Sequence, residues 1–322
     1  MPEDGYYGSE IVDIAKNIYD EYKDTKLDED LEYFKKVAVD YLLGIIKKDL
    51  SDFGVTFDVW TSDKSIRAKG RIEESLKILN EKGLVYKKED ATWLKTTVYG
   101  DDKDRVLIKT DGSYTYLVPD IAYHLDKFDR GFDYLVDVFG ADHHSYVSRL
   151  KASIEALGYD KDKLEVRLLQ MVRLLRDGEI VKMSKRTGGN ITISELVDEI
   201  GKDAARYFFA TRSLDGQMDF DINLALKKSS ENPFFYVGYA NARICSILRD
   251  AESKNINIET NIKNILDEDS KSLLLKVYEF NEVTQSAALK KEPHLITNYV
   301  YELASMFHNY YGKHKILTDD IQ

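Results

Sequence analysis

Apolar residues recur at helical spacing through much of the first hundred residues. Two stretches, 31–50 and 72–83, carry them three and four positions apart, as in helices that bury one face. The run 55–60 has the composition of a strand, and 84–96 has the pattern of two strands joined by a turn. This part of the chain is therefore expected to hold helices accompanied by short strands.

The pattern changes at Arg105, where strand-like and helical stretches alternate. Strands are predicted at 105–109, 114–118, 134–140 and 164–172, and helices at 119–128 and 146–159. Such an order predicts a parallel sheet with crossover helices. The turn at 176–179 predicts a hairpin that pairs 172–175 with 180–183, and a helix is expected to begin near Thr192 or Ser194.

Strand signals stop after Asp219, and three long helical patterns follow. They cover 229–252, 270–291 and 294–314. Asn232 is placed to cap the first of them, with Pro233 at the first helical position. The fold class is therefore α/β followed by an all-α helical bundle.

Composition and charge narrow the class of protein. The chain has 322 residues and a single cysteine, Cys245, which cannot form an internal disulfide, and it has neither a signal-peptide pattern nor an apolar run of membrane-spanning length. These features predict a cytoplasmic protein with no membrane partner. The net charge of −11 argues against broad, non-specific nucleic-acid binding, although residues 161–190 hold eight Lys and Arg against four Asp and Glu.

A basic loop lies inside that local excess of positive charge. Lys182, Lys185 and Arg186 precede Gly188 and Gly189, so the cations stand beside a glycine hinge. Cations on such a loop suit the developing charge of a polyphosphate. The alternative is a solvated basic turn, because short basic motifs recur by accident.

A second polar stretch, 140–144, follows the predicted strand 134–140 and precedes a helix. Ligands collect at this edge of open α/β sheets. His143 and His144 are adjacent, but neighbouring side chains diverge and no further Cys or His spacing supports a metal site, so none is predicted. A capping or core role is the alternative.

A third candidate surface is on the helix that begins at Pro233. Tyr236, Tyr239 and Arg243 fall on one face of it, which suits stacking against single-stranded bases. A packing stripe is the alternative, although an arginine is awkward in a core.

Several segments together resemble a known family. The stretch KMSKRTG resembles the second signature of class I aminoacyl-tRNA synthetases. Longer segments resemble bacterial arginyl-tRNA synthetases in the same order, at 100–133, 140–160, 170–188, 203–213, 219–225 and 232–249. The resemblance covers essentially the whole chain.

The resemblance implies a domain organisation and a reaction. Residues 1–222 would be the C-terminal part of a Rossmann-type nucleotide-binding domain, with a connective insertion at about 1–100 and the signature loop at 182–189. Residues 223–322 would be a helical anticodon-binding domain, truncated at its C-terminal end. The reaction would be arginine–tRNA ligation, in which ATP with Mg²⁺ activates L-arginine and the arginyl group passes to tRNA(Arg).

The resemblance also assigns residues. Lys185 would stabilise the pyrophosphate with support from Lys182, and Tyr116 and Asp120 would contact the arginine substrate. A carboxylate beside an aromatic ring suits a guanidinium. The alternative is a structural role, in which Asp120 stabilises a helix N-terminus beside a core tyrosine. The implied ATP-binding residues are Gly140, Asp142, His143, Met183 and Ser184. The implied tRNA-binding residues are Tyr236, Tyr239 and Arg243.

One family signature is missing. None of the six histidines forms the His-x-Gly-His motif of class I enzymes. We therefore expect this chain to be an internal fragment of the enzyme that is inactive alone. A monomer is also expected. Two alternatives stay open, namely a tRNA-binding module that has lost catalysis and a nucleotidyltransferase with a similar lysine loop; the second would not need the helix at 232–249.

Overall fold

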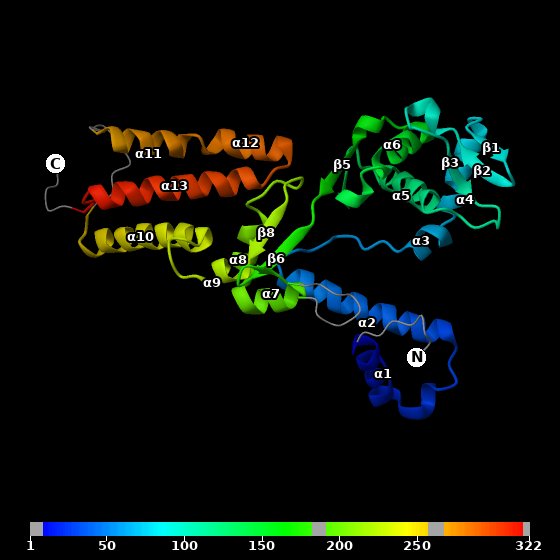
Figure 1. Ribbon diagram of the computed structural model, residues 1–322, viewed down its shortest axis with the longest axis horizontal. Coiled ribbons are helices and arrows are strands. Elements are labelled where there is room, and N and C mark those ends of the chain that lie inside the picture. The colour runs from blue at the N-terminus through cyan, green and yellow to red at the C-terminus, as the bar shows by residue number, and fades with distance from the viewer. Residues whose placement is uncertain (1–8, 182–190, 257–266, 318–322) are drawn as a thin grey trace. The chain divides into compact units, whose positions relative to one another are not determined.

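The computed structural model describes residues 9–181, 191–256 and 267–317. They form two compact units. We call residues 57–171 with 214–217 the cavity unit, and the remaining described residues the bundle unit. Each is described by itself (Figure 1).

The cavity unit contains two small sheets. In the first, β1 (Val85–Lys88), β2 (Ala91–Leu94) and β3 (Arg105–Ile108) pair antiparallel in that order. In the second, β4 (Leu135–Gly140) and β5 (Leu164–Leu169) are parallel, joined by α6 (Tyr146–Leu157). The predicted hairpin at 84–96 and the predicted strand–helix–strand crossover are both confirmed.

Helices pack against these sheets and bury the core of the cavity unit. They are α3 (Asp63–Ala68), α4 (Arg71–Glu81), α5 (Leu117–Asp129) and α6, with short 3-10 turns η2 (Thr96–Tyr99), η3 (Ala141–His143) and η4 (Lys161–Lys163). Leu79, Leu94, Leu107, Leu150 and Leu164 lose all contact with solvent. One continuous core therefore links all four helices to both sheets.

Three predictions in this region are wrong. Of the described residues, 55–60 form no strand, and 114–118 contribute only an isolated bridge between Ile108 and Tyr114. Leu117 and Val118 are buried as the first turn of α5, where the missing N–H of Pro119 costs nothing. The strand from Arg105 pairs antiparallel with β2 and not in the parallel sheet, because alternation along a strand does not specify its partner.

The bundle unit contains a sheet in the order β7 (Glu179–Ile180), β6 (Val172–Arg176), β8 (Met218–Asp221). The antiparallel pairing of β6 with β7 confirms the predicted hairpin over its described residues. The predicted helix start is also confirmed, since Thr192 and Glu195 form a reciprocal capping box on α7 (Ile193–Ile200). Phe208 packs against Phe220 of β8 in the core of this region.

The remaining elements of the bundle unit are helical. They are α1 (Ser9–Tyr22), η1 (Lys23–Lys26), α2 (Leu31–Asp52), α8 (Lys202–Phe209), α9 (Ile222–Leu226), α10 (Pro233–Ser253), α11 (Glu268–Tyr278), α12 (Phe280–Lys290) and α13 (His294–Lys313). Helix α13 packs against α10, α11 and α12, and Ala240, Ala304 and Phe307 form the buried seam (Figure 1). None of the described helices is long and apolar enough to cross a membrane.

The helix predicted over 270–291 is divided into α11 and α12 at Glu279. The hydroxyl of Tyr299 donates to the carbonyl of Lys276 at 2.8 Å. In an unbroken helix that carbonyl would accept from the N–H four residues on. The Tyr299 hydroxyl, which comes from α13, therefore offers a physical reason for the break. The sequence of 270–291 alone could not predict it.

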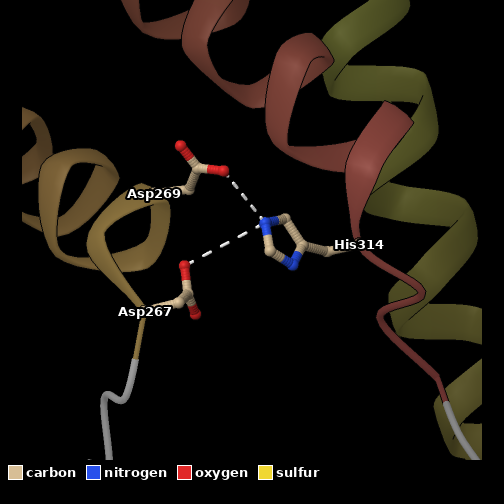
Figure 2. Close-up of side chains that lie close together, drawn as sticks. All are labelled: Asp267, Asp269 and His314. Atoms are coloured by element: carbon tan, nitrogen blue, oxygen red, sulfur yellow. Dashed lines mark hydrogen bonds and ion pairs between the residues drawn. The ribbon is translucent and has the colours of Figure 1, made fainter.

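The start of α11 is tied to the end of α13 by charged side chains (Figure 2). His314 Nε2 lies 3.2 Å from Asp269 Oδ2 and 4.0 Å from Asp267 Oδ1. Lys313 Nζ lies 3.0 Å from Asp269 Oδ2, and Asp267 also caps α11 by accepting from the N–H of Ser270. His314 and Lys313 together lower the pKa of Asp269. The cluster therefore links the start of α11 to the end of α13.

Candidate functional site

The cavity unit encloses a cavity of about 990 Å³. Its walls come from α3, β3, the start of α5, the end of β4, η3 and α6. This volume is at the upper end of ordinary small-molecule sites. Three residues chosen from sequence, Tyr116, Asp120 and His143, all line it.

Asp120 supplies a half-buried carboxylate to the cavity wall. It stands in the first turn of α5, and Tyr146 of α6 donates its hydroxyl to Oδ2. Burial raises the pKa of Asp120, and the hydrogen bond from Tyr146 opposes that rise. Burial with the same hydrogen bond raises the pKa of Tyr146, so this hydroxyl stays a donor. A carboxylate held in this way is suited to a planar cation.

Tyr116 stands one helical turn before Asp120. The sequence placed it at the end of a strand, whereas the structure places it at the N-terminal boundary of α5. Its side chain is 89% exposed although it lines the cavity. Its ring face is therefore free for stacking on a flat cation.

The 140–144 stretch turns from β4 into α6 through η3. A Cβ atom on Gly140 would lie 2.5 Å from Asp142 Oδ1, so a larger residue there would displace the Asp142 side chain. The Asp142 side chain is 82% exposed, with Oδ2 3.7 Å from His143 Nε2. Of these three residues, His143 is the one that lines the cavity. Its ring packs beside those of Phe139 and Tyr146 at centroid distances of 5.9 and 6.4 Å.

The signature loop at 182–189 lies outside the residues that the structure describes. Lys182, Met183, Ser184 and Lys185 lie outside the described residues. What the structure gives is the framework on either side of them, the β6–β7 hairpin before and the capped start of α7 after.

The three α10 residues do come together in the bundle unit. The Arg243 guanidinium lies 4.4 Å from the Tyr239 ring, and its Nη1 is 3.2 Å from Nδ1 of His308. His308 donates from Nε2 to the carbonyl of Tyr236 at 3.0 Å. Together with Ser230 and Phe235 these side chains line a hollow of about 260 Å³. The predicted face is therefore an aromatic cluster with a cation in it, and Tyr239 is 46% exposed.

Comparison with known proteins identifies the family. The family model "tRNA synthetases class I (R), catalytic domain" matches residues 6–215, and the model "DALR anticodon binding domain" matches residues 237–322. A solved putative arginyl-tRNA synthetase from Campylobacter jejuni superposes with a TM-score of 0.89 at 35% identity, covering 99% of this chain and 70% of that one. The chain belongs to the class I arginyl-tRNA synthetase family.

Curated proteins similar to this chain support the same family. The arginine–tRNA ligases of Bacillus licheniformis and Bacillus subtilis are 51% and 50% identical, over 98% and 99% of this chain. The chain spans 58% and 59% of their respective lengths. The arginyl-tRNA synthetase of Thermus thermophilus, at 17% identity and a TM-score of 0.72, is similar in fold.

Some residues that contact the predicted ones were not singled out from the sequence. Tyr146 contacts Asp120 across 26 positions, and His308 contacts Arg243 across 65. Spacing along one helix cannot reveal such pairs. His124, four residues after Asp120 on α5, carried the one local signal, because positions i and i+4 share a helix face.

If Asp120 is the partner of an arginine guanidinium, replacing Tyr146 with phenylalanine is expected to weaken L-arginine binding roughly tenfold, or about 1.4 kcal/mol. The change removes the hydroxyl that holds the Asp120 carboxylate in one orientation and lowers its pKa, so the carboxylate is less ordered and easier to protonate before arginine binds. Isothermal titration of the chain with L-arginine measures the effect. The control is Tyr159→Phe, a stacked tyrosine of the same unit whose hydroxyl contacts Asp129 at 3.4 Å. Equal affinity of Tyr146→Phe and wild-type protein would contradict the assignment.

Proposed function

We propose that this chain contributes to arginine–tRNA ligation. ATP, accompanied by Mg²⁺, would activate L-arginine to arginyl-adenylate, and the arginyl group would then pass to tRNA(Arg). The observation that carries the proposal is the meeting of Tyr116, Asp120 and Tyr146 in one cavity of a chain from this family. We also propose residues 1–222 as the partial catalytic domain and residues 223–322 as the anticodon-binding domain, in a monomeric cytoplasmic protein.

The arginine side chain would enter the cavity with its guanidinium facing Asp120. Oδ2 of Asp120 already accepts from Tyr146, which holds the carboxylate in one orientation. The remaining lone pairs suit the N–H groups of a guanidinium, while Tyr116 offers an aromatic face. Asp120 and Tyr116 would therefore select a planar cation over a neutral side chain of the same length.

The nucleotide would be held by two groups of residues. Gly140, Asp142 and His143 occupy the carboxyl end of β4, the edge at which ligands bind in α/β sheets. Met183 and Ser184 would contact the nucleotide, and Lys182 and Lys185 would neutralise the pyrophosphate as its charge develops. Removing one such donor costs about 3–4 kcal/mol of transition-state stabilisation. The support for these four loop residues is the family signature.

The cluster on α10 would contact the anticodon loop of tRNA(Arg). Tyr236, Tyr239 and Arg243 combine ring faces with a positive charge, which is the combination that single-stranded bases use for stacking. Titrating the chain with tRNA(Arg) and with the same tRNA carrying an altered anticodon, at two salt concentrations, tests this role. Tighter binding of the natural anticodon supports it, whereas equal and steeply salt-dependent binding contradicts it.

Tyr239→Ala is expected to weaken tRNA(Arg) binding by roughly 5- to 100-fold. Stacking of one base on an aromatic side chain contributes about 1–3 kcal/mol. Electrophoretic mobility shifts with tRNA(Arg) at constant salt measure the change. The matched control is Tyr278→Ala, because Tyr278 lies on α11 of the same unit with 77% of its surface exposed. The same affinity for both variants would count against the α10 face.

A further inference from the structure

A buried polar cluster lies behind Asp120, and the proposed function does not use it. It consists of His124 and Lys127 on α5 and Asp137 on β4. Only 3% of His124 and 8% of Asp137 are exposed. Burying charged groups is costly unless they are paired and hydrogen-bonded, so this arrangement calls for an explanation.

Each ring nitrogen of His124 contacts an oxygen atom. Nδ1 lies 2.7 Å from the carbonyl oxygen of Asp120, and Nε2 lies 2.8 Å from Oδ2 of Asp137. A carbonyl oxygen only accepts. Burial favours the neutral form of Asp137, but hydrogen bonds from His124 and Lys127 lower its pKa to about 2, so its carboxylate also only accepts. Both ring nitrogens therefore face acceptors, which is the arrangement that an imidazolium satisfies.

This imidazolium changes the charge balance around Asp120. His124 and Lys127 bring two positive charges, which balance the carboxylates of Asp120 and Asp137. Burial raises the pKa of Asp120, the hydrogen bond from Tyr146 and the charges of His124 and Lys127 lower it, and Asp137 raises it. With a neutral side chain at position 124, two carboxylates would face one ammonium group.

We propose that His124 is a positioning residue for arginine recognition, which keeps Asp120 ionised and clamps its backbone carbonyl at the start of α5. The inference rests on the proposed role of Asp120 as the guanidinium partner. Asp137 acts one step further back, because its carboxylate holds His124 in the charged form. The substrate class that this device serves is a cationic amino acid whose side chain must meet an ionised carboxylate.

The protonation of His124 is measured first, without any ligand. A long-range proton–nitrogen NMR spectrum of the chain at about pH 7 is expected to show both ring nitrogens of His124 protonated, assigned by loss of the signals in His124→Gln. Asp137→Asn keeps the size of the side chain and removes its charge, and is expected to convert the ring to a neutral tautomer. A neutral ring in the wild-type chain would overturn the inference.

Arginine affinity against pH gives the functional readout. Between about pH 5 and 8, His124→Gln is expected to bind L-arginine roughly three- to tenfold more weakly at the acidic end and to approach wild-type affinity at the alkaline end, where Asp120 ionises without help. His144→Gln is the matched control, since His144 is an exposed histidine of the same unit. Asp137→Asn is expected to shift the profile in the same direction, which keeps the test decisive should His124→Gln fail to fold.

These experiments distinguish the positioning role of His124 from the proposed role of Asp120 in binding arginine. A loss of affinity in His124→Gln that is equal at every pH would indicate a merely structural role and overturn the inference alone. A wild-type chain that binds no L-arginine at any pH would overturn the proposed role of Asp120, and the inference with it.

Discussion

Replacing Asp120 with asparagine is expected to weaken arginine binding from roughly 30-fold to several thousand-fold. The carboxylate is half-buried and held by Tyr146. Without it, the guanidinium of bound arginine would lose an ionised partner in a site that has already excluded part of the solvent. Truncating one member of a desolvated charge pair costs about 2–5 kcal/mol, much of it for the charge left behind. Calorimetric titration of the chain with L-arginine measures the loss.

The pH dependence of L-arginine binding by the wild-type chain is a second test of the role of Asp120. Protonated Asp120 cannot pair with a guanidinium, and the pKa of Asp120 is raised mainly by burial. Arginine affinity is therefore expected to decline, as the pH falls, at a higher pH than an exposed aspartate would give. Asp133→Asn is the matched control, because Asp133 is an exposed aspartate of the same unit. Undiminished binding in Asp120→Asn would remove Asp120 from the site.

Replacing Arg105 with methionine is expected to destabilise the chain by about 3–5 kcal/mol. Arg105 and Asp101 are 9% and 6% exposed, and the guanidinium donates to both carboxylate oxygens, at 2.6 and 2.8 Å. Removing the cation leaves a carboxylate buried without its main partner. The double variant Arg105→Met with Asp101→Leu is expected to regain much of the loss, since apolar side chains can replace a buried pair. Urea unfolding at neutral pH measures both free energies.

The free energy of unfolding at acidic pH distinguishes the ion pair of Arg105 and Asp101 from a simple packing contact. Burial alone would raise the pKa of Asp101, but hydrogen bonds from Arg105 and Ser148 outweigh it and lower that pKa. A lowered carboxyl pKa stabilises the fold above the unfolded value, near 3.9, and the contribution disappears as the pH falls through the folded value. The gap between wild type and Arg105→Met should therefore narrow in acid. A gap independent of pH would indicate a loss of packing only.

Local patterns predicted much of the fold. Helical spacing gave α2 and α4, and the strand–helix–strand order gave the parallel pair β4 and β5. Local capping gave the start of α10, since Asn232 accepts from the N–H groups of Phe234 and Phe235. These features follow from local spacing, from capping residues and from the order of the elements along the chain.

Features that depend on distant contacts were out of reach. The stretch 114–118 has the composition of a strand, yet the core of the cavity unit buries Leu117 and Val118 as a helical turn. The break at Glu279 has its partner on α13, through Tyr299. In the site, sequence singled out Asp120 and Tyr116 but could not place Tyr146 against Asp120. Single residues were predictable because their chemistry is local, whereas the network around them is made by the fold.

Ligand discrimination by the unmodified chain tests the central claim most directly. L-citrulline has the length and planarity of L-arginine but carries a neutral ureido group, which can donate hydrogen bonds but cannot form an ion pair with the carboxylate of Asp120. Calorimetric titration of the chain with both amino acids at about pH 8 is expected to show arginine binding at least roughly tenfold more tightly, since pairing with a charged group contributes about 1.5–3 kcal/mol. Equal affinities, or binding of neither amino acid, would contradict the assignment of this cavity to the arginine side chain.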